Sequence, residues 1–242
     1  MTQPSSDVRW LDRDGVRIAY EVRPGPASAV PLLLSHGYSA SKAMWRPNLD
    51  ALSAARTVIT WDMRGHGETE APDDIAAYSH ALTVDDMRAL LDECDVPAAA
   101  VGGLSLGGFM SLDFYRSHPD RVHCLLLFDT GPGFKKDASR QGWNDNALAT
   151  ADRYKGGGLS LAARGMLVQQ DAGVILSLPD VAVPTLVLVG ANDSGFLAAA
   201  DYMTATIPKA EKAVIPDAGH SANIDQPEAF NAAVTDFLSR YA

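Results

Sequence analysis

Gly103-Leu104-Ser105-Leu106-Gly107 is the most informative segment of this chain. It is a G-x-S-x-G pentapeptide between an apolar run, residues 98–102, and a segment with helical spacing of apolar residues, residues 106–118. We therefore expect a buried strand before Ser105 and a helix after it. Only small residues fit beside a serine on so tight a turn, which accounts for the two glycines. Such a turn projects the hydroxyl above the carboxyl end of a sheet, near the free N–H groups of a helix, and suits a nucleophile whose reaction creates an oxyanion.

Composition and length indicate an ordinary enzyme domain. The 242 residues, of which 47% are hydrophobic, are enough for one α/β domain with a sizeable core. Residues 1–7 lack the features of a signal peptide, and no apolar run approaches the ~20 residues of a transmembrane helix. With Cys94 and Cys124 expected to be reduced thiols, these features predict a cytoplasmic enzyme. The net charge of −10 argues against nucleic acid or a membrane as partner.

Strand-like and helix-like segments alternate along most of the chain. We expect strands at residues 16–22, 31–35, 57–61, 98–102, 122–128, 185–190 and 213–216. We expect helices at residues 44–55, 83–94 (with Thr83 as N-cap), 106–118 and 227–241. Apolar strands joined by helical crossovers predict a mostly parallel α/β sheet with helices on both faces, whose ligands bind at the carboxyl ends of the strands.

Residues 134–178 break this alternation, because they contain no clear strand. Two helix-like stretches, residues 144–154 and 159–170, flank the segment Lys155-Gly156-Gly157-Gly158. We therefore divide the chain into a core, residues 1–133 and 179–242, and a short helical lid, residues 134–178, inserted after the sixth strand of the fold. The glycine run is interpreted as a flexible joint, and a splice at 155–158 that shortened a longer lid is the alternative.

Ser105 needs a general base, because a serine hydroxyl is a poor nucleophile at neutral pH. Of the six histidines, His220 is the one expected at the correct edge of the sheet, in the loop after the last strand. A carboxylate should orient it. Asp193 follows the strand at 185–190 and is preferred, while Asp129, which also ends a strand, is the rival.

Two backbone N–H groups are expected to stabilise the oxyanion. One belongs to Leu106, directly after the nucleophile, and the other to Tyr38, in the loop after the strand at 31–35. Three polar residues nearby are expected to brace their loops: His36, Arg64 and His66.

The ordered motifs His36-Gly37, Asp62–Gly67, Gly103–Gly108, Gly190–Asp193 and Gly219-His220 resemble those of the α/β-hydrolase fold family. The resemblance extends from about Val16 to Tyr241. It implies the α/β-hydrolase fold and a Ser105–His220–Asp193 triad that acts without cofactor or metal. The chain is most similar to small esterases, 3-oxoadipate enol-lactonases and cofactor-free haloperoxidase-like members.

These features predict a serine hydrolase that cleaves small, largely apolar esters or lactones through an acyl-enzyme on Ser105. The candidate pocket residues are Trp45, Phe134, Trp143, Met166 and Phe196. The lid carries six basic and four acidic side chains, a net charge of +2. These charges could indicate an anionic substrate, but the interpretation we favour is that they lie on a helix face exposed to solvent. A C–C bond hydrolase or perhydrolase on the same triad, and a non-catalytic ligand-binding member, are the alternatives. We expect a monomer or a homodimer.

Overall fold

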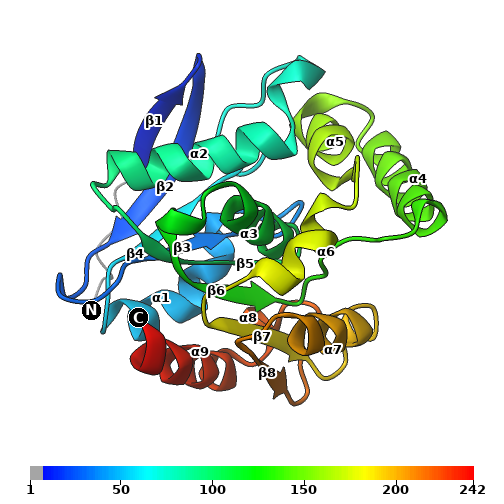
Figure 1. The fold of residues 1–242 in the computed structure, drawn as a ribbon. Helices are drawn as coiled ribbons and strands as arrows, with labels where there is room; N and C mark the ends of the chain where they lie inside the picture. The colour runs from blue at the N-terminus through cyan, green and yellow to red at the C-terminus, as the bar shows by residue number, and fades with distance from the viewer. Residues whose placement is uncertain (1–7) are drawn as a thin grey trace.

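All eight strands of residues 8–242, the part of the chain that the computed structural model describes, join in one sheet (Figure 1). They are β1 (Arg9–Arg13), β2 (Val16–Arg23), β3 (Leu32–Ser35), β4 (Val58–Trp61), β5 (Ala99–Leu104), β6 (Val122–Phe128), β7 (Thr185–Gly190) and β8 (Ala210–Ile215). The spatial order is β1-β2-β4-β3-β5-β6-β7-β8. The first two pairings, β1 with β2 and β2 with β4, are antiparallel, and all others are parallel. The predicted mostly parallel sheet is confirmed. The expectation that the chain begins without a signal peptide concerns residues 1–7, which lie outside the described residues.

Helices cover both faces of this sheet, as the uniformly apolar strands predict. The longer ones are α1 (Arg46–Ser53), α2 (His80–Glu93), α3 (Leu106–Ser117), α4 (Asp137–Arg153), α7 (Leu197–Thr206) and α9 (Pro227–Tyr241). Leu33 and Val101 pack on the face covered by α2, α3 and α7, and Leu32 and Leu34 on the face covered by α1 and α9. The shorter helical segments are η1 (Lys42–Trp45), η2 (Ile75–Ala77), η3 (Pro119–Arg121), α5 (Gly157–Ala162), η4 (Ala163–Leu167), α6 (Gly173–Ser177), η5 (Leu178–Asp180) and α8 (Ala222–Asp225).

The segment between β6 and β7 contains helices and no strand. Helices α4 and α5 pack together at one end of the molecule (Figure 1), and the chain returns to the sheet through η4, α6 and η5. The glycine run forms the turn into α5 and is tightly packed at one point. A Cβ on Gly158 would lie 2.8 Å from the Cα of Gly65. This turn is therefore packed onto the core loop after β4.

Helix α2 begins earlier than the sequence indicated. Its N-cap is Ser79, whose hydroxyl accepts the N–H of Leu82 at 3.1 Å. The predicted cap, Thr83, is wrong: it lies inside the helix and donates its hydroxyl to the Ser79 carbonyl at 2.9 Å. The acidic pair that suggested a first turn, Asp85 and Asp86, lies in mid-helix, where Asp86 is turned inward.

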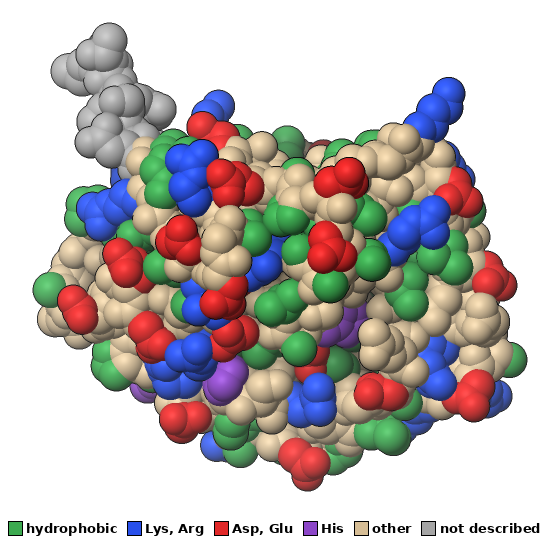
Figure 2. Space-filling view, turned by 90° about the horizontal axis from the view of Figure 1, so that it is seen from above, with side chains coloured by type: hydrophobic (Ala, Val, Ile, Leu, Met, Phe, Trp, Pro, Cys, Tyr) green, Lys and Arg blue, Asp and Glu red, His purple; other side chains and the backbone are tan. Residues whose placement is uncertain are grey.

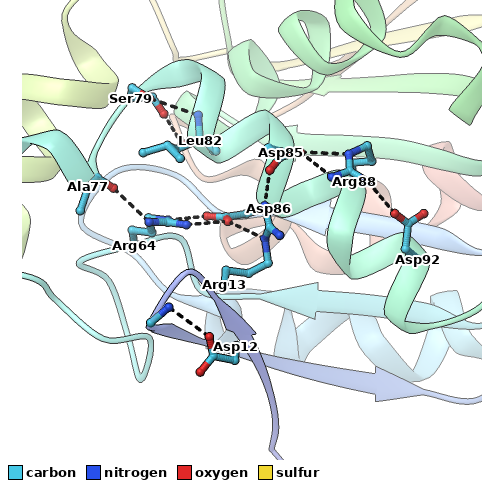
Figure 3. Close-up of polar contacts among 12 residues, drawn as sticks. Asp12, Arg13, Arg64, Ala77, Ser79, Leu82, Asp85, Asp86, Arg88 and Asp92 are labelled. Carbon is cyan, nitrogen blue, oxygen red and sulfur yellow. Dashed lines mark hydrogen bonds and ion pairs between the residues drawn. The ribbon is translucent and has the colours of Figure 1, made fainter.

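Asp86 forms a buried ion pair with Arg64 (Figure 3). The Nε and Nη2 atoms of Arg64 donate to the two carboxylate oxygens at 2.7 and 2.9 Å. The Asp86 side chain is 0% exposed and that of Arg64 4%. The Nε atom of Arg13 lies 3.5 Å from the same carboxylate. The pair joins α2 to the loop after β4 and to β1, so Arg64 has the structural role expected for it.

The surface seen in Figure 2 carries a mixture of acidic and basic side chains, with no extended area of one sign. Among residues 8–242, no helix is both long and apolar enough to cross a membrane.

Candidate active site

Ser105 lies between β5 and α3 in a backbone conformation that side-chain-bearing residues rarely adopt, with φ 55° and ψ −114°. A Cβ on Gly103 would lie 2.5 Å from the carbonyl carbon of Gly107, and one on Gly107 would lie 2.3 Å from the last carbonyl oxygen of β3. The Ser105 N–H donates to the Phe128 carbonyl at 2.9 Å, and the Thr130 hydroxyl donates to the Ser105 carbonyl at 2.6 Å. The surrounding strands therefore hold the strained turn in place.

His220 and Asp193 are joined by a hydrogen bond. The distance between Nδ1 of His220 and Oδ2 of Asp193 is 2.8 Å. The Asp193 side chain is 9% exposed and that of His220 43%, so the carboxylate is shielded and the imidazole is accessible. Phe196 stacks on the imidazole, with ring centroids 4.9 Å apart. A carboxylate beside Nδ1 keeps the proton on that nitrogen, which leaves Nε2 free to accept one.

The structure brings these three residues to one edge of the sheet. Ser105, Asp193 and His220 follow the carboxyl ends of β5, β7 and β8, which lie in one parallel set. Ser105 and Phe196 line the same cavity, and Phe196 packs on His220. Phe196 therefore connects the cavity beside Ser105 with the histidine–aspartate pair.

Asp129, the rival carboxylate, lies beneath this site and bonds to backbone groups. Its Oδ1 accepts the N–H of Gly190 at 2.7 Å, and its Oδ2 accepts that of Ala222 at 3.4 Å. It thereby links the loops that carry Asp193 and His220. Burial raises the pKa of Asp129 to about 7, against the two backbone N–H bonds that favour the charged form. The bracing role that the sequence favoured for Asp129 agrees with these contacts.

As the pH rises, we expect the free energy of unfolding of Asp129→Asn to increase relative to that of the unsubstituted protein. The folded state holds the Asp129 proton more tightly than the unfolded chain, whose carboxyl titrates near 3.8. The stabilisation from this carboxyl is therefore complete below about pH 4 and is lost as the pH rises through about 7. An asparagine keeps an oxygen for the Gly190 N–H without this dependence. Urea unfolding of both proteins at acidic and mildly alkaline pH measures the difference. An equal difference at the two pH values contradicts the expectation, and Asp217→Asn, at an exposed position, is the control.

The two expected oxyanion donors belong to Leu106, directly after Ser105, and to Tyr38, directly after Gly37. Leu106 begins α3, so its N–H is among those that have no partner within the helix. Gly37 lies against Ser105, since a Cβ on it would be 3.5 Å from the Ser105 Cβ. The next residue, Tyr38, donates its hydroxyl to the Leu159 carbonyl at 2.8 Å, and burial raises its pKa to about 12. The loop is therefore fastened to α5 by a neutral phenol.

His36 braces this loop from below, as the sequence predicted. Its Nε2 accepts the N–H of Met63 at 3.0 Å, and its Nδ1 lies 2.7 Å from the Gly37 carbonyl. Burial lowers the pKa of His36 to about 3, so the ring stays neutral. His66 is also buried and packs 5.0 Å from it, ring centroid to ring centroid. Both histidines serve the structure of the loops.

A cavity of about 610 Å³ opens beside Ser105 and is lined mainly by apolar side chains. It includes four of the five predicted pocket residues: Phe134, Trp143, Met166 and Phe196. The fifth, Trp45, is wrong. It is fully buried and packs against Phe128 and Phe230, at ring-centroid distances of 6.0 and 6.3 Å. Segment η1 turns this side chain toward the face of the sheet that α1 and α9 cover, away from the cavity.

Other residues that line the cavity were not predicted as pocket residues. They include Phe109, Gln169, Ile175 and Tyr202. Phe109 lies four residues after Ser105, one helical turn along α3, and this spacing could have identified it. Tyr202 belongs to α7, a helix that the sequence analysis did not predict.

The fold and the site geometry define the class of protein. The sequence model of the α/β-hydrolase fold matches residues 30–165, and the chain belongs to that family. A putative 2-succinyl-6-hydroxy-2,4-cyclohexadiene-1-carboxylate synthase of Bacillus subtilis is 26% identical over 93% of this chain and 96% of its own length. The 3-oxoadipate enol-lactonase 1 of Acinetobacter baylyi is 25% identical, over 94% and 95%. A thermophilic esterase from Thermogutta terrifontis has the same fold, with a TM-score of 0.84 and 24% identity over 97% of this chain and 99% of that one.

Proposed function

We propose that this protein is a serine hydrolase that cleaves carboxylic esters or lactones of small, largely apolar substrates. The observation that carries the proposal is the strained turn at Ser105 on the same edge of the sheet as the 2.8 Å His220–Asp193 hydrogen bond. A nucleophile, a base and a carboxylate that orients the base are the parts that acyl transfer to water requires.

In this mechanism Ser105 attacks the substrate carbonyl carbon while Nε2 of His220 accepts the hydroxyl proton. Asp193 holds the imidazole and stabilises the imidazolium that forms. The N–H groups of Leu106 and Tyr38 stabilise the oxyanion. The tetrahedral intermediate collapses as His220 gives the proton to the leaving alcohol. His220 then takes a proton from water, whose hydroxide attacks the acyl-enzyme, and returns it to Ser105.

The cavity supports a small and mainly apolar substrate. Its volume of about 610 Å³ lies within the usual range for small-molecule sites. Residues 134–178 supply much of its lining, which supports the proposal that they act as a lid on the core. Lys135 and Lys136 also belong to the lining and are exposed. The enol-lactonase and esterase relatives agree with hydrolysis of a lactone or an ester.

A panel of p-nitrophenyl esters and aliphatic lactones of increasing chain length tests the proposal. We expect turnover of several of them, with a preference for chains that fill the cavity. Folded protein that hydrolyses none of the panel would contradict the proposal. Activity instead on a vinylogous diketone, or with hydrogen peroxide as acyl acceptor, would point to C–C hydrolysis or perhydrolysis on the same residues.

A further inference from the structure

The loop after β3 is bonded to the core at both ends and to the lid at its middle. At its start, Nε2 of His36 accepts a backbone N–H of the loop after β4 at 3.0 Å. At its end, the Lys42 N–H donates to Oδ1 of Asp62 at 2.5 Å. Between these two anchors, the Tyr38 hydroxyl donates to the Leu159 carbonyl of α5 at 2.8 Å. The middle of the loop is therefore joined to a helix that lies more than 100 residues further along the chain.

Tyr38 and Ser39 are the central residues of a tight turn. The Ala40 N–H closes this turn by donating to the Gly37 carbonyl at 3.2 Å. Ser39 has φ 61°, a conformation that residues with side chains rarely adopt. The Tyr38 N–H takes no part in closing the turn, and no acceptor among residues 8–242 bonds to it. A strained turn persists only where its surroundings hold it, so the place of this N–H depends on what fastens the turn.

Helix α5 packs closely on the core beside Tyr38. A Cβ on Gly158 would lie 2.8 Å from the Cα of Gly65, so the two backbones are in direct contact. The Tyr38 ring packs edge-on against His66 of the core and Tyr154 of the lid, with ring centroids 5.5 and 6.0 Å apart. Because the Tyr38 hydroxyl bonds to a main-chain carbonyl of α5, it follows the position of the helix itself.

We propose that the side chain of Tyr38 is a positioning residue, which keeps its own backbone N–H in place for the oxyanion only while α5 lies on the core. The proposal rests on the proposed function, in which this N–H is one of the two oxyanion donors. Such a donor acts only within hydrogen-bond distance of the oxygen on which negative charge develops. When α5 moves away from the core, the turn loses its bond to Leu159, and the oxyanion site loses the fixed place of one donor.

Tyr38→Phe tests this proposal, because it removes the hydroxyl and keeps both the ring and the backbone N–H. We expect kcat on the best ester of the panel to fall about tenfold, a part of the roughly 10²-fold to 10³-fold that loss of a whole oxyanion donor costs. KM should stay within about twofold, because Tyr38 is not among the residues that line the cavity. Tyr154→Phe, which removes the hydroxyl of the neighbouring ring, is the matched control and should keep kcat.

An alkyl trifluoromethyl ketone separates oxyanion stabilisation from support of the fold. It forms a tetrahedral adduct with a serine nucleophile, and the oxygen of that adduct is an anion. Its inhibition constant should therefore rise about tenfold in Tyr38→Phe, in parallel with the fall in kcat. A lower melting temperature with kcat and the inhibition constant both unchanged would assign the hydroxyl to the fold alone and overturn the proposal.

Gly158→Ala tests the part that α5 plays. The added methyl group must displace α5 from the loop after β4, so kcat should fall about tenfold here as well. Tyr38→Phe and Gly158→Ala together should lose about as much as either alone, since both break the same connection, whereas independent sites would give a loss of about 100-fold. Gly142→Ala, at a position of α4 with open space around it, is the matched control and should keep kcat. Losses that multiply in the double variant would overturn the proposal.

The unsubstituted protein distinguishes failure of this proposal from failure of the proposed function. If it hydrolyses no ester and forms no adduct with the ketone or with a fluorophosphonate, the proposed function itself is overturned. If it hydrolyses esters and Tyr38→Phe does so equally fast, only the coupling between α5 and the oxyanion donor is overturned.

Discussion

Ser105→Ala is expected to lower kcat on the best ester of the panel by about 10⁴-fold to 10⁶-fold. The triad acts as a unit, so loss of the nucleophile removes the acyl-enzyme pathway whatever the other residues do. Substrate binding should change little, because the cavity walls remain. Steady-state kinetics with purified protein measures both quantities.

The matched control for this variant is Ser111→Ala. Ser111 lies in α3, the helix that follows Ser105, and is buried, and its hydroxyl donates to the Gly107 carbonyl at 2.8 Å. This variant should keep most of the activity. If Ser105→Ala keeps activity comparable to that of Ser111→Ala, the nucleophile has been misassigned.

Asp86→Ala is expected to lower the free energy of unfolding by about 3–5 kcal/mol, because it leaves Arg64 buried without its partner. Figure 3 shows that Asp86 faces Arg64 and lies beside Arg13, whereas Asp85 pairs with both Arg88 and Arg13. Chemical denaturation followed by circular dichroism measures the loss.

Asp85→Ala provides the comparison at the adjacent position. Its side chain is 40% exposed and pairs with Arg88 and Arg13 near the surface, so its removal should cost about 0–1 kcal/mol. Equal losses of unfolding free energy for the two variants would show that the buried Arg64–Asp86 pair stabilises the fold no more than the exposed pairs of Asp85 do.

The sequence predicts the parallel part of the sheet well, because strands buried on both faces are continuous apolar runs. Strand β1 was missed, since three of its five residues, Arg9, Asp12 and Arg13, are charged and the strand lies at an edge. Helix α7 was missed because the alanines of its first turns form no apolar stripe. Both elements depend on their neighbours rather than on a local pattern.

The residues of the candidate site likewise divide into those that a local sequence pattern identifies and those that depend on the folded structure. Ser105, Asp193 and His220 could be named from the sequence because each follows a strand that the apolar pattern identifies, and parallel strands bring their carboxyl ends together. The cavity could not be derived in this way. The direction of the Trp45 side chain depends on the rotation of η1, and the place of Gln169 in the cavity wall depends on a long-range backbone contact with Asn144.

The most direct test of the account is labelling with a fluorophosphonate, followed by mass spectrometry of the digested protein. The account predicts one phosphonyl group on the peptide that contains Ser105, no labelling of Ser105→Ala, and slow labelling of His220→Ala because the hydroxyl has lost its base. Intact protein that does not react, or a label that persists in Ser105→Ala, would contradict the claim that Ser105 is the activated nucleophile of this site.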